Sequence, residues 1–504
     1  MRHTERIIKD SSIYTVSTII SQLLGVFTSI AMRRFLTPEM MGIWTTFLVI
    51  LNYSLFAHLG VFTAVEVKIP YLRGRNENDT IQHVRNAAFT LAIVISTMVI
   101  AIAFLGSYIF AQKITPDIIL GIRILAFIIM ATLFYNLYIV MMRADKKFFL
   151  LSKGIVFNSL AMLLFVSIFT YFFKLRGIYF ATLFATAASW LYLYFKTGYR
   201  LNFYFKGEVA KMLAKIGLPI LLSGIAYTIL LSIDKIMIVK MLGPRELGYY
   251  SIAILALTYT HNFPKLFSIV IFPTMQEEFG KSSSHKDLLR YVRQPSLIMA
   301  YIFPVVLATA YFAIPVLVYY VLPKYSDGII SMKILLIGCF FISLVPLTHN
   351  FIIAINKQTV LIPITLAAVA CGIGLNYLMI TAGYGISGVA LGTSIAYFIY
   401  FAIMFLYASI HSGSISNIYK YLLEMCAPLF YSFTVIIILE NLITVKPTLA
   451  RSIAQAAIFY IFYIPVLWYI DRKTLVISNF FKKTAKPLPG AEAIFPNIPS
   501  EEQI

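Results

Sequence analysis

Among the ionisable side chains in the long apolar runs of this sequence are four cations and one carboxylate. They are Arg123, Asp234, Lys235, Lys265 and Lys333. A charged group at the centre of a bilayer is costly, so such groups usually face a cavity or a partner. Four of the five are cationic, and desolvated cationic side chains bind phosphate groups strongly. The set therefore predicts a basic cavity that binds an anionic headgroup such as a phosphate or pyrophosphate.

The predicted roles of these five residues differ. Asp234 and Lys235 are adjacent, and neighbouring residues of a helix point about 100° apart. We therefore expect one of them to pair with another helix while the other meets ligand. Lys235 and Lys265 are expected to face the cavity. For Arg123 and Lys333, near the outer ends of their helices, a cavity role and snorkelling to the outer headgroups both stay open.

Motifs of nucleotide binding are incomplete in this sequence. Gly383 to Gly388 matches the GxGxxG string, but it joins two apolar runs without a preceding strand or the acidic residue required downstream. Gly280-Lys281-Ser282 resembles the end of a phosphate loop, yet Met275 occupies the position of the first glycine. No histidine pair, carboxylate dyad or nucleophile elbow stands out. We expect no enzyme activity, no cofactor and no metal site.

Most of the remaining sequence is apolar enough to be solvated by lipid. Of the 504 residues, 60% are hydrophobic and 12% are charged, and the mean hydropathy is +0.84. A membrane-spanning helix needs about 20 apolar residues. Runs of this length are found at 11–35, 41–65, 86–112, 117–142, 154–173, 178–195, 216–241, 246–272, 296–321, 329–354, 360–381, 385–410, 426–444 and 451–470. The sequence predicts an all-α integral membrane protein with about 14 transmembrane helices.

The net charge of +20 comes from Lys and Arg residues that are unevenly distributed between the loops of this topology. When loops alternate from a cytoplasmic amino terminus, the inner loops hold about 27 Lys and Arg and the outer loops about 10, as the positive-inside rule requires. The basic charge therefore indicates orientation rather than nucleic-acid binding. We expect a multi-pass protein of the cell inner (plasma) membrane with both termini cytoplasmic and no nucleic-acid partner.

Two parts of the sequence repeat each other. Leu36 to Gly42 (LTPEMMG) matches Leu242 to Gly248 (LGPRELG) at an offset of 206. Asp117 to Leu125 matches Asp327 to Leu335 at an offset of 210. The matches predict two parallel six-helix repeats whose facing lobes enclose a cavity that can open to either side of the membrane.

The repeats divide the chain into five expected regions. Tyr199 to Lys206 mixes basic and aromatic residues, a composition suited to the headgroup region. The predicted regions are an N-terminal six-helix lobe (1–195), a cytoplasmic interfacial linker (196–215), a C-terminal six-helix lobe (216–410), two extra transmembrane helices (426–470) and a cytoplasmic, mostly disordered tail (471–504).

Short motifs in both copies carry a resemblance to a known family. In the first copy they are Asp10 to Tyr14, Arg34 to Trp44 and His58 to Val61, and in the second Ser232 to Lys235 and Leu242 to Tyr250. They resemble the polysaccharide and O-antigen flippases of the multidrug, oligosaccharidyl-lipid and polysaccharide exporter superfamily. The resemblance covers about residues 5–470.

The resemblance implies a V-shaped pair of lobes plus two appended helices. The implied cargo is a polyprenyl-pyrophosphate-linked oligosaccharide, moved from the cytoplasmic to the outer leaflet by alternating access for cell-surface polysaccharide biosynthesis. Implied partners are this lipid-linked sugar, membrane lipid, and the glycosyltransferases or polymerase of the pathway. Similar members line their cavity from the first two helices of each lobe, which here implies roles for Arg33 or Arg34, His58, Asp234, Lys235 and Lys265.

Alternative functions would require different side chains or loops. A multidrug cation antiporter of the same superfamily would favour acidic residues in the cavity, where the candidates are Glu66, Asp234 and Glu440. The cationic excess favours anionic cargo instead, although charge alone leaves a peptidoglycan-precursor flippase open. A polysaccharide polymerase or ligase would carry a large outer loop, and the topology leaves none. The energy source stays open between an ion gradient, the membrane potential and consumption of the product.

Overall fold

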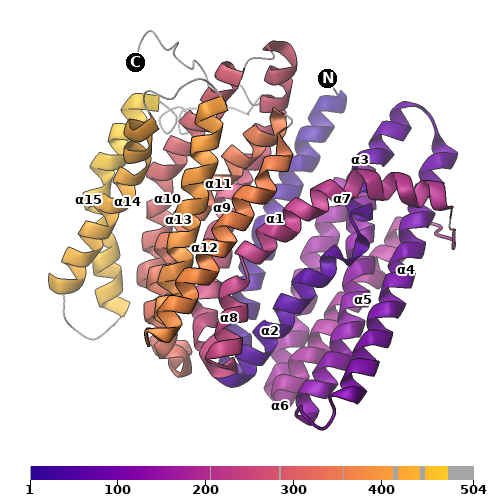
Figure 1. The fold of residues 1–504 in the computed structure, drawn as a ribbon, viewed down its shortest axis with the longest axis horizontal. Helices are drawn as coiled ribbons and strands as arrows, with labels where there is room; N and C mark the ends of the chain where they lie inside the picture. Colours follow the sequence, from indigo (N-terminus) through magenta and orange to yellow (C-terminus); the bar gives the residue numbers. More distant parts are fainter. Residues whose placement is uncertain are drawn as a thin grey trace. The chain divides into compact units, whose positions relative to one another are not determined.

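The computed structural model describes residues 2–204, 206–282, 285–355, 357–411, 418–442 and 449–474 (Figure 1). The tail from 475 onward, predicted to be disordered, lies outside these residues. In the described part every regular element is a helix. The α-helices are α1 (Arg2–Phe35), α2 (Pro38–Ser54), α3 (Val61–Gly74), α4 (Asn78–Ile109), α5 (Pro116–Ala144), α6 (Phe148–Thr197), α7 (Gly207–Leu230), α8 (Ile233–Met241), α9 (Pro244–Ser282), α10 (His285–Val321), α11 (Ile329–Ala354), α12 (Leu361–Thr381), α13 (Gly385–His411), α14 (Ile418–Leu442) and α15 (Leu449–Thr474), with short 3-10 helices η1 (Leu55–His58), η2 (Pro323–Gly328) and η3 (Gln358–Val360).

The helices are those of a multi-pass membrane protein. Among the described residues 11 helices are long and apolar enough to cross a membrane, or up to 12 if the bent pair α7–α8 forms one span. The all-α membrane fold expected from the sequence is confirmed, whereas the expected count of about 14 spans is not.

Part of the difference in the number of spans arises at α6, which counts as one helix but contains two predicted spans. Its 50 residues would extend for about 75 Å if straight, more than twice the hydrocarbon thickness of about 30 Å. The helix is interrupted at Lys174, which has φ 50° and ψ −123°. Asn158 Nδ2 then donates to Ser189 Oγ at 3.0 Å, although the two residues are 31 positions apart. The element is therefore a helical hairpin whose arms hold the two predicted spans 154–173 and 178–195.

The chain forms two compact units, residues 1–251 and 252–504. In the first, α1 packs on α6, α5 packs between α4 and α6, and α3 packs on α7. In the second, α13 packs on α11 and α12, while α14 and α15 pack on α10. The lobe and linker boundaries expected from the sequence remain a prediction.

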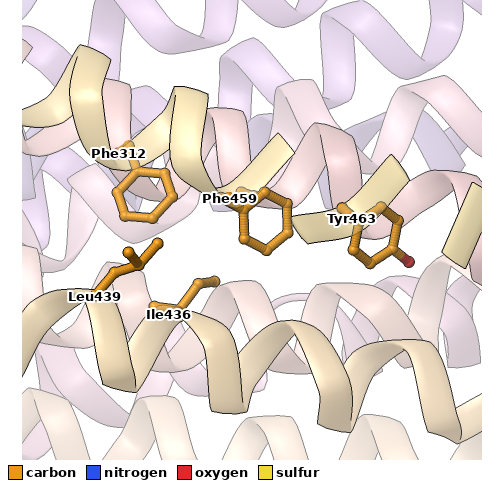
Figure 2. Close-up of a cluster of buried hydrophobic side chains, with 6 residues drawn as sticks. Phe312, Ile436, Leu439, Phe459 and Tyr463 are labelled. Atoms are coloured by element: carbon orange, nitrogen blue, oxygen red, sulfur yellow. The ribbon is translucent and has the colours of Figure 1, made fainter. Parts of the chain in front are cut away.

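An aromatic cluster attaches the last two helices to the second unit (Figure 2). Phe459 and Tyr463 of α15 stack with ring centroids 5.3 Å apart, and Phe312 of α10 contacts Phe459 edge-on at 6.3 Å. Ala308 of α10 and Ile436 and Leu439 of α14 complete the cluster. All of these side chains are buried, so α14 and α15 are integral to the second unit.

The repeated heptapeptides pack against each other within the first unit. Each one begins a helix at a proline, Pro38 in α2 and Pro244 in α9. A Cβ atom added to Gly42 would overlap the carbonyl of Pro244, and one added to Gly248 would overlap that of Pro38. Glycine alone lets the two backbones approach this closely. The reciprocal contact is the pattern that a local two-fold relation between the copies produces.

The segment after α6 is docked along α4. Gln82 Nε2 donates to the carbonyl of Arg200 at 2.5 Å. Asn86 Oδ1 accepts from the amide of Asn202 at 3.1 Å, and Thr90 Oγ1 accepts from the amide of Tyr204 at 2.8 Å. Gln82, Asn86 and Thr90 are spaced four residues apart and so share one face of α4. This docking gives residues 199–204 a fixed path that composition alone did not indicate.

A buried carboxylate anchors the start of the same segment. Asp145 accepts from Arg73, from Arg85 Nη2 at 2.7 and 2.8 Å, and from the Tyr199 hydroxyl at 2.6 Å. Burial first, and then the hydrogen bond to Asp145, raises the pKa of Tyr199 above its ordinary value. The phenol therefore keeps its proton at neutral pH and remains a donor to the carboxylate. We refer to Asp145, Arg73, Arg85 and Tyr199 as the Asp145 cluster.

Candidate functional site

A pocket of about 520 Å³ lies within the first unit. Its volume is in the range of small-molecule binding sites. Its lining residues come from α2, η1, α3, α7 and α8, of which α3 packs on α7 and α2 packs on α8. The lining residues are Val49, Asn52, Leu55, Phe56, His58, Thr63, Leu221, Gly224, Thr228, Leu231, Ser232 and Lys235.

Two interrupted helices supply most of this lining. After α2 the chain passes through η1, then through Leu59 and Gly60 with φ of 50° and 79°, before α3 begins. On the other side α7 and α8 are bent by 48° at the break around Ser232. Irregular backbone at membrane depth is tolerated where it lines a cavity, and discontinuous helices commonly bind the substrates of transporters. The sequence predicts unbroken helices over 41–65 and 216–241, and the structure differs at both.

Segments that line the pocket or adjoin its helices touch through their backbones at two places. One is the reciprocal contact of Gly42 with Pro244 and of Gly248 with Pro38. The other joins Gly60 to Gly217, where a Cβ on either residue would overlap the other residue's backbone. At both places the backbones are in direct contact, so a residue larger than glycine would push the segments apart.

Lys235 supplies the positive charge of the pocket. Its side chain is 12% exposed, and Nζ donates to the carbonyl of Leu231. Nζ also lies 3.5 Å from Asp234 Oδ1. Asp234 itself is completely buried, and its Oδ2 accepts from the Tyr250 hydroxyl at 2.9 Å. The ammonium therefore lines the pocket, while the neighbouring carboxylate is directed into the protein.

His58 is the second ionisable residue of the lining. Its Nδ1 accepts from the amide of Gly60 at 3.0 Å, and its ring stacks on Phe62 with centroids 4.5 Å apart. A neutral imidazole that accepts at Nδ1 carries its proton on Nε2. The stacking and the hydrogen bond fix the ring, so Nε2–H is the group available as a donor.

The lining also contains the uncharged polar residues Asn52, Thr63, Thr228 and Ser232. The Tyr53 hydroxyl and Ser232 Oγ lie 2.7 Å apart and join α2 to the break between α7 and α8. Asn52 and Thr63 line the pocket without a side-chain hydrogen bond to any residue that the structure describes. The lining holds amide and hydroxyl groups beside one ammonium, and it includes no Asp or Glu. It can therefore bind an anion together with hydroxyl-bearing groups.

Two of the predicted site residues in the first copy lie elsewhere. Arg33 is 4% exposed, with Nε donating to Ser251 Oγ at 3.1 Å, Nη2 donating to the Ser251 carbonyl at 2.8 Å and Nη1 donating to the Ser29 carbonyl at 3.0 Å. It links the end of α1 to α9. Arg34 is exposed. Neither residue is part of the pocket lining.

The remaining predicted residues also fall outside the pocket. Arg123 Nε donates to Ser107 Oγ at 3.0 Å, and its guanidinium lies 5.5 Å from the Phe104 ring centroid. Lys333, in the second unit, pairs with Glu440. Lys265 lies in α9, but its side chain is outside the part that the structure describes. Of the eight predicted residues, the structure brings Lys235 and His58 into one pocket with Asp234 behind them.

Comparison with solved structures defines the class of fold. An inward-facing multidrug resistance MATE family transporter of the MOP superfamily has a TM-score of 0.67 at 14% identity, covering 79% of this chain and 96% of that chain. An outward-facing structure of such a transporter gives 0.60 at 15% identity, with coverages of 82% and 96%. A MOP superfamily transporter from Pyrococcus furiosus, described as having a binding pocket of reverse polarity that suggests a different function, gives 0.59 at 15% identity, with coverages of 81% and 95%. The chain has the fold of the MOP-superfamily transporters.

The sequence comparison identifies the family. The profile of the polysaccharide biosynthesis protein family matches residues 31–327, more than half of the chain. The chain therefore belongs to the polysaccharide biosynthesis protein family. No curated protein sequence matches it. The family resemblance noted in the sequence is confirmed, and the fold is one that solved transporters share.

Proposed function

We propose that the protein flips a polyprenyl-pyrophosphate-linked oligosaccharide from the cytoplasmic to the outer leaflet of the cell inner membrane. The observation that carries this proposal is a pocket at two helix breaks whose lining contains Lys235 and no acidic residue. Membership of a polysaccharide biosynthesis family supports the sugar part of the cargo. Transport proceeds by alternating access, with both termini cytoplasmic and with glycosyltransferases or a polymerase as pathway partners.

The pocket offers separate groups to the two ends of such a headgroup. The ammonium of Lys235 binds a pyrophosphate oxygen through a charge-assisted hydrogen bond. Nε2–H of His58, the amide of Asn52 and the hydroxyl of Thr63 bind sugar hydroxyls, which both donate and accept. A purely apolar pocket would leave those sugar groups unpaired on entry, at a cost for each one.

A cationic cargo fits the pocket less well. A multidrug cation antiporter needs an acidic side chain facing its substrate, and Asp234 faces Tyr250 and Lys235 instead. Glu66 lies 3.9 Å from Arg143 and Glu440 pairs with Lys333, and neither glutamate lines the pocket. A peptidoglycan precursor shares the pyrophosphate with the proposed cargo, so it serves as a separate substrate in the test.

The test is leaflet transfer in vesicles that contain the purified chain and a defined lipid-linked sugar. We expect Lys235→Gln to lower the transfer rate by about tenfold or more, because one charge-assisted hydrogen bond is lost. The matched control is Lys240→Gln, an exposed lysine of the same helix outside the pocket, which should transfer at the unmodified rate. Full activity of Lys235→Gln, or faster transfer of a cationic drug than of any lipid-linked sugar, would refute the proposal.

A further inference from the structure

The Lys235 ammonium has partners inside the protein before any ligand arrives. It donates to the Leu231 carbonyl, left without a helical donor at the break after α7, and it faces Asp234 Oδ1 at 3.5 Å. Within the described part of the chain, the partners of Asp234 are this ammonium and the Tyr250 hydroxyl. Tyr250, Asp234 and Lys235 thus form a chain of polar contacts from the buried interior to the pocket, which we call the guard relay.

An anion that enters the pocket must compete with Asp234 for the ammonium. When Lys235 turns toward a ligand, a completely buried carboxylate is left with the Tyr250 hydroxyl alone. Removing one partner of a buried ion pair is strongly unfavourable. Separating Lys235 from Asp234 therefore costs the same free energy whichever anion binds. Only an anion whose interaction with Lys235 is stronger than this cost remains bound.

We propose that Asp234 guards Lys235 against the headgroups of ordinary anionic phospholipids. The proposal rests on the function proposed above, because a lipid-linked cargo enters by a route that phospholipid headgroups can also follow. A phosphodiester headgroup carries one negative charge, whereas a pyrophosphate presents more charge to the same ammonium. A fixed cost therefore keeps the abundant, weaker ligand out while the pyrophosphate still binds. Specificity arises here from a penalty on the wrong ligand.

The experiment measures binding of geranyl pyrophosphate, a water-soluble prenyl pyrophosphate, to the full chain. The protein is placed in nanodiscs of phosphatidylcholine alone or of phosphatidylcholine and phosphatidylglycerol in equal amounts. In neutral lipid we expect Asp234→Asn to bind the probe about tenfold more tightly than the unmodified chain. On changing to anionic lipid, the affinity of Asp234→Asn should fall by about tenfold more than that of the unmodified chain, because phospholipid now occupies the unguarded ammonium.

Two further variants separate the guard from a structural role. In Tyr250→Phe, Asp234 keeps Lys235 as its partner and holds it more firmly, so the affinity should fall in neutral lipid without added lipid dependence. Asp117→Asn removes an exposed carboxylate paired with Arg176 and should match the unmodified chain in both lipids.

The outcomes distinguish the two proposals. If the unmodified chain fails to bind the probe in neutral lipid, the proposed pocket is refuted and the guard with it. If the unmodified chain binds, but Asp234→Asn shows the same affinity and the same lipid dependence, only the guard is refuted. Equal loss of binding in Asp234→Asn and Tyr250→Phe in both lipids would assign the relay to folding alone.

Discussion

Replacing Gly248 with alanine is expected to destabilise the protein by about 3 kcal/mol or more, although the same substitution inside a helix is usually favourable. The added Cβ would overlap the carbonyl of Pro38, and its distance to the Pro38 Cα would be only 2.8 Å. A backbone atom cannot rotate away as a side chain can, so α2 and α9 must separate. The measurement is the midpoint of thermal unfolding of the purified protein, together with the yield of folded protein from membranes.

The chain contains a suitable control for this effect. Gly106 lies in α4, and a Cβ added there meets no atom within 4 Å. Gly106→Ala should therefore keep or raise the midpoint, because alanine favours the helix over glycine by up to about 1 kcal/mol. Gly42→Ala, the counterpart in the first copy, should lower the midpoint as Gly248→Ala does. A midpoint for Gly248→Ala equal to that of Gly106→Ala would contradict the close contact of the two motifs.

Replacing Asp145 with alanine is expected to cost about 3 kcal/mol of stability and to release the segment docked on α4. The carboxylate side chain is 7% exposed and accepts hydrogen bonds from two arginines and a tyrosine. Without it, two guanidinium groups and a phenol lose their common acceptor in a partly buried place. Limited trypsin digestion should then cut after Arg200 much faster than in the unmodified protein.

An exposed ion pair provides the comparison for the Asp145 cluster. Asp117 and Arg176 have side chains that are 46% and 59% exposed, and such pairs contribute about 0 to 1 kcal/mol. Asp117→Ala should therefore change neither the unfolding midpoint nor the rate of cleavage after Arg200. If Asp145→Ala proved as stable and as resistant to trypsin as Asp117→Ala, the segment would be held by α4 alone.

The membrane fold could be predicted from sequence because lipid imposes a strong constraint. Spans must be apolar over about 20 residues, so runs such as 117–142 and 385–410 correspond closely to α5 and α13. The hairpin in α6 was also predictable, because its two apolar runs are separated around Lys174. The helix breaks could not be located from hydropathy, because its average over about 20 residues hides a short interruption. The polar run Ser232-Ile233-Asp234-Lys235 inside an apolar segment was the signal for the break after α7.

The candidate site was predictable only in part. Lys235 stood out because a lysine in an apolar run needs a polar neighbourhood, and its placement beside a pocket agrees with that physical reason. Asn52 and Thr63 gave no comparable signal, because uncharged polar residues occur in many spans without a binding role. Arg33 was implied only by the family resemblance, and its guanidinium is bound by Ser29 and Ser251 within the protein. Such pairing depends on three-dimensional neighbours that spacing alone does not reveal.

The reciprocal packing of Pro38–Gly42 and Pro244–Gly248 restricts substitution at both motifs together. Each glycine is constrained by the other half, so neither copy is free to accept a larger residue there on its own. At the same offset of 206, the counterparts of Asp234 and Lys235 are Thr28 and Ser29. The two heptapeptides are therefore alike where their backbones touch, whereas the charged pair Asp234–Lys235 has uncharged residues at the matching positions.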